Sequence, residues 1–508
     1  MLRRDVLKTL AALAAVPSAA LAEDAPLHVG DTSTPFNAQT VKNLARALAE
    51  RDYQPRPSIP KEWENISYDQ YRKIWFDTRN ALWENTTRPQ RLDVFPPGLY
   101  YGQGIEINVV EDGGARPLVF DLEVFDRTDQ FPDLPLNENM GYSGLRLRAD
   151  LRNSGAFTEY AVFQGASYFR GIGTGEIYGL SARGLALKTG DPMGEEFPDF
   201  TGFWIETPEA SDASVTLHAL LDSPSCSGAY RFEITHGDVL HMEVEATIFA
   251  RAEMAHVGIA PLTSMFLFDA TDRARFSDFR PNVHDSDGLL IHNGAGEVIW
   301  RPLANPKTLQ ISAFGDQNPK GFGLMQRKRD FSDYNDLEAL YHKRPSVWIT
   351  PRGDWGTGAV TLVEIPADLE IYDNIVAYWR PANPITAGEE HHMRYGLRWG
   401  ADPAPNPPEL LRVLSTAMGG RPEGGLVMVI DFEDGSALPE DLSAVDVILR
   451  SSTGTTTPGI LQRNPETNGP RLAFTFMPEG ADVAEFRVQL RTGDAPLSEV
   501  WLYRWTKT

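Results

Sequence analysis

Apolar and polar residues alternate on both sides of one tight turn, and this feature constrains the fold most strongly. Tyr230, Phe232 and Ile234 are each separated by one polar residue. The same spacing returns over Leu240–Ile248, after a turn at residues 236–238 that contains glycine and aspartate. A period of two places every apolar side chain on one face of an extended strand. We therefore predict an antiparallel hairpin with one buried face.

Similar short patterns recur along the chain, which predicts a mainly β protein with few helices. Further predicted strands are Val215–Leu221, Thr361–Ile365, Leu426–Phe432 and Val445–Leu449. One amphipathic helix is expected over residues 41–48, with Asn37 as its cap. A second short helix is expected over residues 68–80. The connections are long and rich in glycine, proline and aspartate, and such loops commonly carry function on a sheet scaffold.

The first 22 residues are predicted to be an export signal rather than part of the fold. Arg3 and Arg4 precede an apolar run over residues 10–16, and Ala20-Leu21-Ala22 offers a small-residue cleavage site. The paired arginines favour the twin-arginine route. An ordinary secretory signal with a chance arginine pair is the alternative. Either route predicts a protein of the periplasm.

A proline-rich segment predicts a division into two domains. Residues 400–408 contain four prolines and are expected to form a stiff linker. Residues 23–399 would form the larger β domain, and residues 409–508 have the size of one β-sandwich. In the last predicted strand, Trp501, Tyr503 and Trp505 share one face. The smaller domain lacks a dense group of acids and aromatics, which indicates a supporting or docking module.

Composition limits the possible partners. The formal net charge is −23, which disfavours nucleic acids and anionic membrane surfaces as ligands. A neutral ligand fits better, although an acidic surface also simply keeps a protein soluble. Cys226 is the single cysteine, so the chain cannot form an internal disulfide. We expect Cys226 to be a packing residue rather than a nucleophile.

Carboxylates and aromatic residues gather between Pro261 and Pro381, which points to carbohydrate chemistry. Cleavage of a glycosidic bond needs one protonated carboxyl as acid and a second, ionised one as nucleophile or base. Asp373 precedes an apolar segment, and the resulting desolvation would raise its pKa and suit an acid. Asp285 and Asp287 occupy a polar turn that is expected to stay wet and suit a base. A turn or helix-cap role for Asp373 is the alternative.

Other chemistries find little support. Residues 285–288 resemble the start of a calcium loop, but the later glutamate is missing. Residues 171–176 contain three glycines but end in glutamate, without the surrounding βαβ pattern of a dinucleotide site. We therefore predict neither a metal nor a cofactor.

Several longer motifs carry a family resemblance. They include Gly165–Arg170, Tyr178–Ala186, Gly194–Pro198, Ala260–Phe266, Arg280–Gly288, Trp300–Leu303, Arg344–Trp348 and Gly353–Gly356. On these motifs the chain resembles the osmoregulated periplasmic glucan biosynthesis proteins G and D, over roughly residues 36–399. The twin-arginine-like signal is more similar to the D type.

The resemblance implies a fold and an activity. The large domain would be a β-sandwich like that of galactose mutarotases, and the small domain would be immunoglobulin-like. Members act on β-1,2-glucan, some as anomer-inverting endo-β-1,2-glucanases, and a related member transfers the chain to form a cyclised glucan. We expect the glucanase. A transglycosylase, or a non-catalytic module that binds glucan for a membrane synthase, remains the alternative.

The resemblance also implies residue roles. Asp373 would be the general acid, and Asp285 the base that acts through a relay of waters. Glu370 and Tyr341 match supporting positions. We further predict that Trp348, Trp355, Arg344 and Asp287 contact the substrate, with core packing as the alternative for the two tryptophans. The expected partners are β-1,2-glucan, a membrane glucan synthase and a second copy of the chain, but no nucleic acid.

Overall fold

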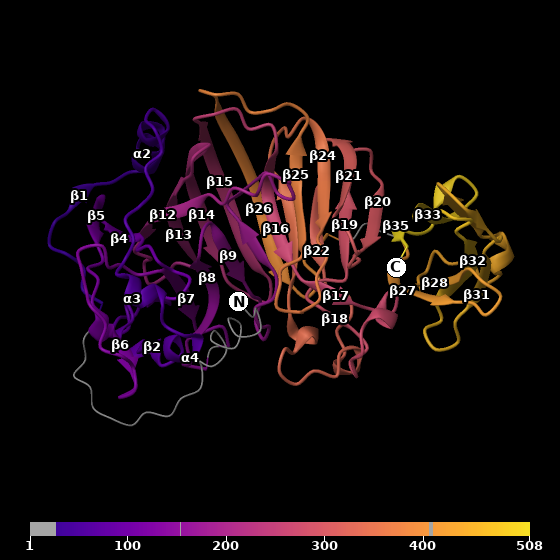
Figure 1. The fold of residues 1–508 in the computed structure, drawn as a ribbon, viewed down its shortest axis with the longest axis horizontal. Coiled ribbons are helices and arrows are strands. Elements are labelled where there is room, and N and C mark those ends of the chain that lie inside the picture. The colour runs from indigo at the N-terminus through magenta and orange to yellow at the C-terminus, as the bar shows by residue number, and fades with distance from the viewer. Residues whose placement is uncertain (1–26, 153, 406–409, 508) are drawn as a thin grey trace. The chain divides into compact units, whose positions relative to one another are not determined.

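The structure, a computed structural model, describes residues 27–152, 154–405 and 410–507 (Figure 1). Strands dominate these residues, which confirms the predicted fold class. The predicted export signal and residues 406–408 of the predicted linker lie outside the described residues. No helix in the described ranges has the length and apolar character needed to cross a membrane. The helices and 3-10 turns found there are α2 (Thr40–Ala49), α3 (Lys61–Glu64), α4 (Tyr68–Tyr71), η1 (Thr78–Asn80), η2 (Leu122–Val124), η3 (Arg273–Arg275), η4 (Phe331–Asp333), η5 (Tyr341–Lys343) and η6 (Leu442–Ala444).

The first predicted helix is confirmed as α2. Val41 and Ala45 are buried on its inner face, as the apolar spacing requires. The cap differs from the prediction, because Gln39 occupies the N-cap position. The Asn37 side chain instead accepts a hydrogen bond from the Gln39 backbone N–H at 2.9 Å, in the turn that precedes the helix.

The second predicted helix, over residues 68–80, is wrong beyond its first turn. A capping box between Ser67 and Gln70 starts α4, which ends at Tyr71. The chain then forms β2 (Ile74–Phe76), which pairs with β6 (Phe125–Arg127). Ile, Trp and Phe fit a pleated, half-buried surface, so this strand pairing replaces further helix.

The described residues divide into two compact units. The amino-terminal unit contains residues 27–261 and 380–400, and the carboxy-terminal unit contains residues 262–379 and 401–507, within the described ranges. The predicted domain limits at residues 399 and 409 stay a prediction.

Two main sheets form the amino-terminal unit besides the β2–β6 pair, and their aromatic side chains meet in its core. Phe163 on one sheet and Phe232 on the other have ring centroids 5.2 Å apart in an edge-to-face arrangement. Phe169 makes the same contact with Phe232 at 5.2 Å. The first sheet has the order β1 (Thr34–Pro35), β5 (Gly114–Pro117), β4 (Glu106–Glu111), β12 (Asp199–Glu206), β13 (Ser214–Asp222), β14 (Cys226–Thr235), β15 (Leu240–Ala250) and β26 (Glu390–Gly400). The second has the order β16 (Val257–Ser264), β10 (Ser181–Arg183), β9 (Tyr168–Gly171), β8 (Thr158–Gln164), β7 (Gly144–Ala149) and β3 (Gln90–Phe95), and β11 (Leu185–Leu187) also pairs with β16.

The hairpin predicted from alternation is confirmed as β14 and β15, which lie side by side in Figure 1. Ile234 pairs with Met242, so the turn falls where the glycine and aspartate predicted it. Phe232, Ile234 and Val244 are buried, while the intervening residues of β15 near the turn are exposed. Cys226 begins β14 and is buried, which raises the pKa of its thiol to about 12. A thiol in that state suits packing, as expected.

The carboxy-terminal unit contains three main sheets. One has the order β23 (Ser346–Pro351), β22 (Gly321–Met325), β19 (Gly288–His292), β20 (Val298–Pro302), β35 (Val500–Thr506), β33 (Val483–Thr492) and β29 (Asp446–Ser451), with β34 (Ala495–Pro496) on β33. Another has the order β21 (Gln310–Gln317), β24 (Thr357–Glu364) and β25 (Ile375–Pro381). The third has the order β27 (Val413–Gly420), β28 (Leu426–Phe432), β32 (Pro470–Met477) and β30 (Thr455–Thr456), with β31 (Ile460–Arg463) on β32. In addition, β17 (Phe266–Phe268) pairs with β18 (Val283–His284).

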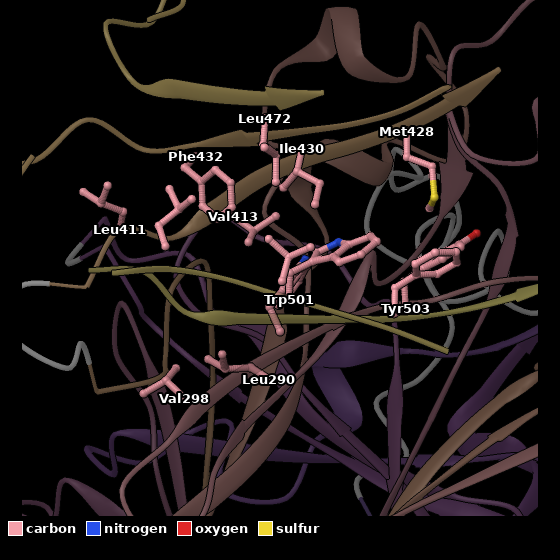
Figure 2. Close-up of a cluster of buried hydrophobic side chains, with 14 of the residues drawn as sticks. Leu290, Val298, Leu411, Val413, Met428, Ile430, Phe432, Leu472, Trp501 and Tyr503 are labelled. Carbon is pink, nitrogen blue, oxygen red and sulfur yellow. The ribbon is translucent and has the colours of Figure 1, made fainter. Parts of the chain in front are cut away.

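The last hundred residues share one hydrophobic cluster with strands far earlier in the chain. Figure 2 shows Trp501 and Tyr503 of β35 among side chains of β27 and β28, with Leu290 of β19 and Val298 of β20 nearby. The cause is a parallel pairing of β20 with β35, which matches Trp300 to Trp501. The carboxy-terminal strands are therefore packed as part of this unit's core.

Candidate active site

The candidate residues of the predicted site lie on three stretches of the carboxy-terminal unit. Asp285 and Asp287 follow β18, Tyr341 opens η5, and Glu370 and Asp373 lie in the loop between β24 and β25. Backbone hydrogen bonds fix the first stretch: the Asp285 N–H donates to the Met265 carbonyl and the Asp287 N–H donates to the Met325 carbonyl, both at 2.8 Å.

Asp285 is completely buried, and the prediction of a wet turn is wrong. The Arg344 guanidinium forms an ion pair with the Asp285 carboxylate, and both side chains are at most 4% exposed. The preceding His284 explains the burial, because Phe266 stacks on its ring at 5.4 Å and Tyr334 packs against it edge-on at 5.3 Å. Aromatic rings from other segments therefore cover a turn whose own sequence is polar.

Asp287 and Arg344 also lie inside the protein, which contradicts their predicted contact with substrate. The Asp287 carboxylate accepts hydrogen bonds from the backbone N–H groups of Arg327 at 3.1 Å and Lys328 at 3.3 Å. Burial raises the pKa of Asp287. Arg344, besides pairing with Asp285, donates from Nε to the Ala339 carbonyl at 3.1 Å. Both side chains hold neighbouring segments in place.

Tyr341 and Glu370 are brought together, while their supporting roles stay a prediction. The Tyr341 hydroxyl donates to Glu370 Oε2 at 3.2 Å. The guanidinium carbon of Arg344 lies 4.4 Å from the centre of the Tyr341 ring. Burial raises the pKa of Tyr341 well above its ordinary value, so the hydroxyl keeps its proton at any physiological pH. Asp285, Arg344, Tyr341 and Glu370 thus form one continuous series of contacts.

Arg280 completes this series, and sequence reasoning assigned it no role. Its Nη1 lies 2.7 Å from Glu370 Oε2 and also 2.7 Å from Asp336 Oδ2, while Nη2 lies 2.7 Å from Asp278 Oδ2. Burial alone would lower the pKa of Arg280, but the surrounding carboxylates raise it. Arg280 belongs to one of the family-like motifs, which was the one available signal of its importance.

Asp373 differs from Asp285 because its side chain is only half-buried. It follows Glu370 by three positions, between Tyr372, which is 50% exposed, and the buried Asn374. The Asn374 amide donates to the Phe266 carbonyl at 2.8 Å and accepts from the Phe266 N–H at 2.8 Å. The loop that carries Asp373 is therefore anchored to β17 by one side chain.

The two predicted tryptophans have different surroundings. Trp348 is 0% exposed and packs against His292 at 4.7 Å, so its prediction as a sugar contact is wrong and core packing is its role. Trp355 is half-buried, and its ring lies 6.2 Å from that of Trp379. Asp354 accepts a hydrogen bond from the Gly356 N–H at 2.9 Å and stabilises the turn that presents Trp355. Contact between Trp355 and substrate stays a prediction.

The acids of this region pair with arginines and backbone groups. Among the described residues, no group of three or more His, Cys, Asp or Glu side chains is arranged to hold a metal ion. The arrangement can supply a half-buried carboxyl, a buried carboxylate compensated by a guanidinium, and a neutral phenol that both donates and accepts hydrogen bonds. Those groups suit proton transfer.

Comparison with known proteins identifies the family of this chain. Residues 36–505 match the family described as "Periplasmic glucan biosynthesis protein, MdoG". The chain belongs to this family. The family's name implies a periplasmic location and a part in glucan biosynthesis.

Relatives with curated names agree with this membership. "Glucans biosynthesis protein G" of Vibrio cholerae serotype O1 is 48% identical over 476 residues, which is 93% of this chain and 87% of the relative. The protein of the same name from Shewanella sp. strain W3-18-1 is 46% identical over 476 residues, with the same coverage. "Glucans biosynthesis protein G 1" of Shewanella oneidensis is 45% identical over 477 residues and is also covered to 87%.

A solved structure with a galactose mutarotase-related fold is a much more distant match. The enzyme from Lactobacillus acidophilus is 12% identical, with a TM-score of 0.23 over 51% of this chain and 94% of that chain. A superposition of this quality supports no conclusion about this chain. A periplasmic glucan biosynthesis protein with a mainly β fold is what the comparisons and the structure jointly establish.

Proposed function

We propose that this chain cleaves β-1,2-glucan as an anomer-inverting endo-glucanase within periplasmic glucan biosynthesis. The supporting observation is the series of contacts from buried Asp285 through Arg344, Tyr341 and Glu370, which ends on the loop that carries Asp373. Membership in a family named for glucan biosynthesis gives the substrate class.

In this proposal Asp373 is the general acid. Its half-buried carboxyl, on a loop anchored by Asn374, donates a proton to the departing glycosidic oxygen. Inversion requires a water that attacks the anomeric carbon from the opposite face while a base removes its proton. The leaving sugar gains the proton of Asp373, and the new reducing end gains the hydroxyl of the water.

Asp285 is the proposed base, and its burial means that it acts at a distance. A fully buried carboxylate cannot contact the attacking water directly, so the proton must pass through intervening groups. Tyr341 is suited to this position because its neutral hydroxyl both donates and accepts. Glu370 orients that hydroxyl, while Arg344 compensates the charge of Asp285. Ordered water would complete the path.

A transglycosylase is the second candidate function, and the complete burial of Asp285 is the observation that favours it. Because the base is reached only through a relay, a sugar hydroxyl in the place of the attacking water could pass its proton along the same path. The third candidate function is non-catalytic: the chain would bind glucan as a partner of a membrane synthase. Incubation with linear β-1,2-glucan and mass spectrometry separates all three: new reducing ends indicate hydrolysis, a cyclic product without them indicates transfer, and unchanged glucan indicates binding only.

Export by the twin-arginine route, as in the D type, is part of the proposal. It depends on Arg3 and Arg4, and the relatives compared above carry the G name. Replacing both arginines with lysine should block twin-arginine export and leave precursor in the cytoplasm. Continued accumulation in the periplasm would show an ordinary secretory signal instead.

The proposed partners are β-1,2-glucan, a membrane glucan synthase and a second copy of the chain. Light scattering of the purified protein tests the dimer, for which a monomeric mass at micromolar concentration is the contrary result. Co-purification from membranes tests the glucan synthase as a partner.

A further inference from the structure

A pocket of about 410 Å³ in the carboxy-terminal unit contains an unusual group of arginines. Its walls come from β20, β21, β29, β33 and β35, and they include Arg301, Arg450, Arg487 and Arg504. Glu485 is the single acidic residue of the lining. The chain as a whole has a net charge of −23, so four guanidinium groups around one cavity are a local excess of positive charge.

The strand register puts these side chains together. Arg450 of β29 is directly opposite Arg487 of β33, and Glu485 of β33 is opposite Arg504 of β35. The alternate residues of β33, Phe486 and Val488, are buried in the hydrophobic core. Glu485 and Arg487 must therefore point to the other face of the sheet, where the pocket lies.

Three of the four arginines already have acidic partners. Arg301 pairs with the buried Glu364 at 3.0 Å, and Arg504 pairs with Glu485 at 2.5 Å. Arg487 pairs with Glu297 at 2.5 Å. Arg450 is exposed and has no side-chain hydrogen bond or ion pair within the described residues. The lining and its partners therefore leave one positive charge uncompensated, and it directly faces another arginine, an arrangement that like-charge repulsion disfavours.

A polar group in the same wall also lacks a partner. Ser312 of β21 lines the pocket and is 8% exposed. Its buried hydroxyl makes no hydrogen bond to any other group in the described ranges. Buried hydroxyls in folded proteins nearly always have a partner, so this exception needs an explanation. A ligand oxygen in the pocket would provide one.

We infer that this pocket binds a small, singly charged oxyanion, either a phosphodiester or a carboxylate. The planar fork of Arg450 matches two oxygens of such a group, and Arg487 across the strand pair adds a second donor. The single uncompensated positive charge of the pocket lining would be balanced by the one negative charge of the ligand. The volume is within the range of small-molecule pockets. The inference depends on no residue of the proposed active site and stands independently of the glucanase proposal.

Calorimetric titration of the whole protein tests the inference. The probes are sodium dimethyl phosphate and sodium acetate, each at constant ionic strength set with sodium chloride, because salt screens exposed charges. Saturable binding of dimethyl phosphate identifies a phosphodiester site, and saturable binding of acetate identifies a carboxylate site. If neither probe binds saturably, the inference is overturned.

Variants localise the binding. Arg450→Gln should weaken binding about tenfold or more, since the exposed side chain can be replaced without loss of a core contact. Ser312→Ala should weaken binding about threefold. Arg116→Gln, which removes a half-buried arginine of the other unit, should bind as the wild type does. Equal binding by Arg450→Gln and the wild type would reveal an adventitious ion only and would overturn the assignment.

Discussion

The turn after β18 and the loop before β25 both carry a candidate aspartate, yet their surroundings are opposite. Asp285 is fully buried and paired with Arg344, and it follows His284, on whose ring Phe266 stacks. Asp373 is half-buried beside an exposed tyrosine, on a loop anchored by the amide of Asn374. The comparison teaches that local polarity does not decide burial: the more polar segment is the drier one. It also separates two kinds of side chain, one that is partly accessible to solvent and one that contacts only its neighbours within the protein.

The largest expected effect is on catalysis at the accessible aspartate. Asp373→Asn removes the proposed acid, so glucan cleavage should fall by about 10²–10⁴-fold. The free energy of unfolding should change by less than about 1 kcal/mol, since the residue is only half-buried. Asp368→Asn, an exposed aspartate of the same loop, is the matched control. Retained cleavage by Asp373→Asn would remove Asp373 from the mechanism.

The buried aspartate should instead affect stability and activity together. Asp285→Asn leaves the Arg344 guanidinium buried without its counter-charge, which costs about 3–5 kcal/mol of unfolding free energy. Adding Arg344→Met should restore part of that stability but not activity. Urea denaturation of the single and double variants measures this. Additive losses in the double variant would contradict the close coupling of the pair.

Tyr341 tests the connection between the two regions. Tyr341→Phe keeps the ring against Arg344 but removes the hydroxyl that donates to Glu370. Loss of the hydrogen bond should destabilise the protein by about 1 kcal/mol. The turnover number should fall at least about tenfold if the hydroxyl belongs to the relay, with little change in KM. Steady-state kinetics on linear β-1,2-glucan make the distinction, and unchanged turnover would exclude the phenol from the proton path.

The smallest expected effect is a pH dependence at Asp287. Burial raises its folded-state pKa above the ordinary value of 3.8, so the folded state holds this proton more tightly than the unfolded state does. Its contribution to stability is present below pH 3.8 and is lost as the pH rises through the raised pKa. Asp287→Asn should remove this contribution to the change of unfolding free energy with pH between pH 3.8 and the raised pKa. Denaturation at several pH values measures it. An unchanged slope would mean that burial does not control this carboxyl.

Much of the fold followed from the sequence, because alternation is a local property. The hairpin of β14 and β15 and the strand Leu426–Phe432 were predicted with their limits nearly or fully correct. The helix over residues 68–80 failed because β2 pairs with β6, about fifty residues later in the chain. The supporting positions of Tyr341 and Glu370 came from family resemblance and not from spacing, and their hydrogen bond to each other was not predicted.

The environment of the site was not predictable in the same way. Asp285 is buried because Arg344, 59 positions away, supplies its counter-charge, and because Phe266 and Tyr334 cover the turn. Such contacts depend on tertiary packing that no local pattern encodes. Trp348 illustrates the same limit, since an aromatic residue beside polar ones can belong either to a core or to a binding surface.

Proton NMR of freshly cleaved linear β-1,2-glucan tests the central claim most directly. If Asp373 protonates the leaving oxygen while water is activated through Tyr341 toward Asp285, the new reducing ends must first appear as the α-anomer and then equilibrate. Initial formation of the β-anomer, or no new reducing ends under conditions in which the protein binds the glucan, would contradict the account.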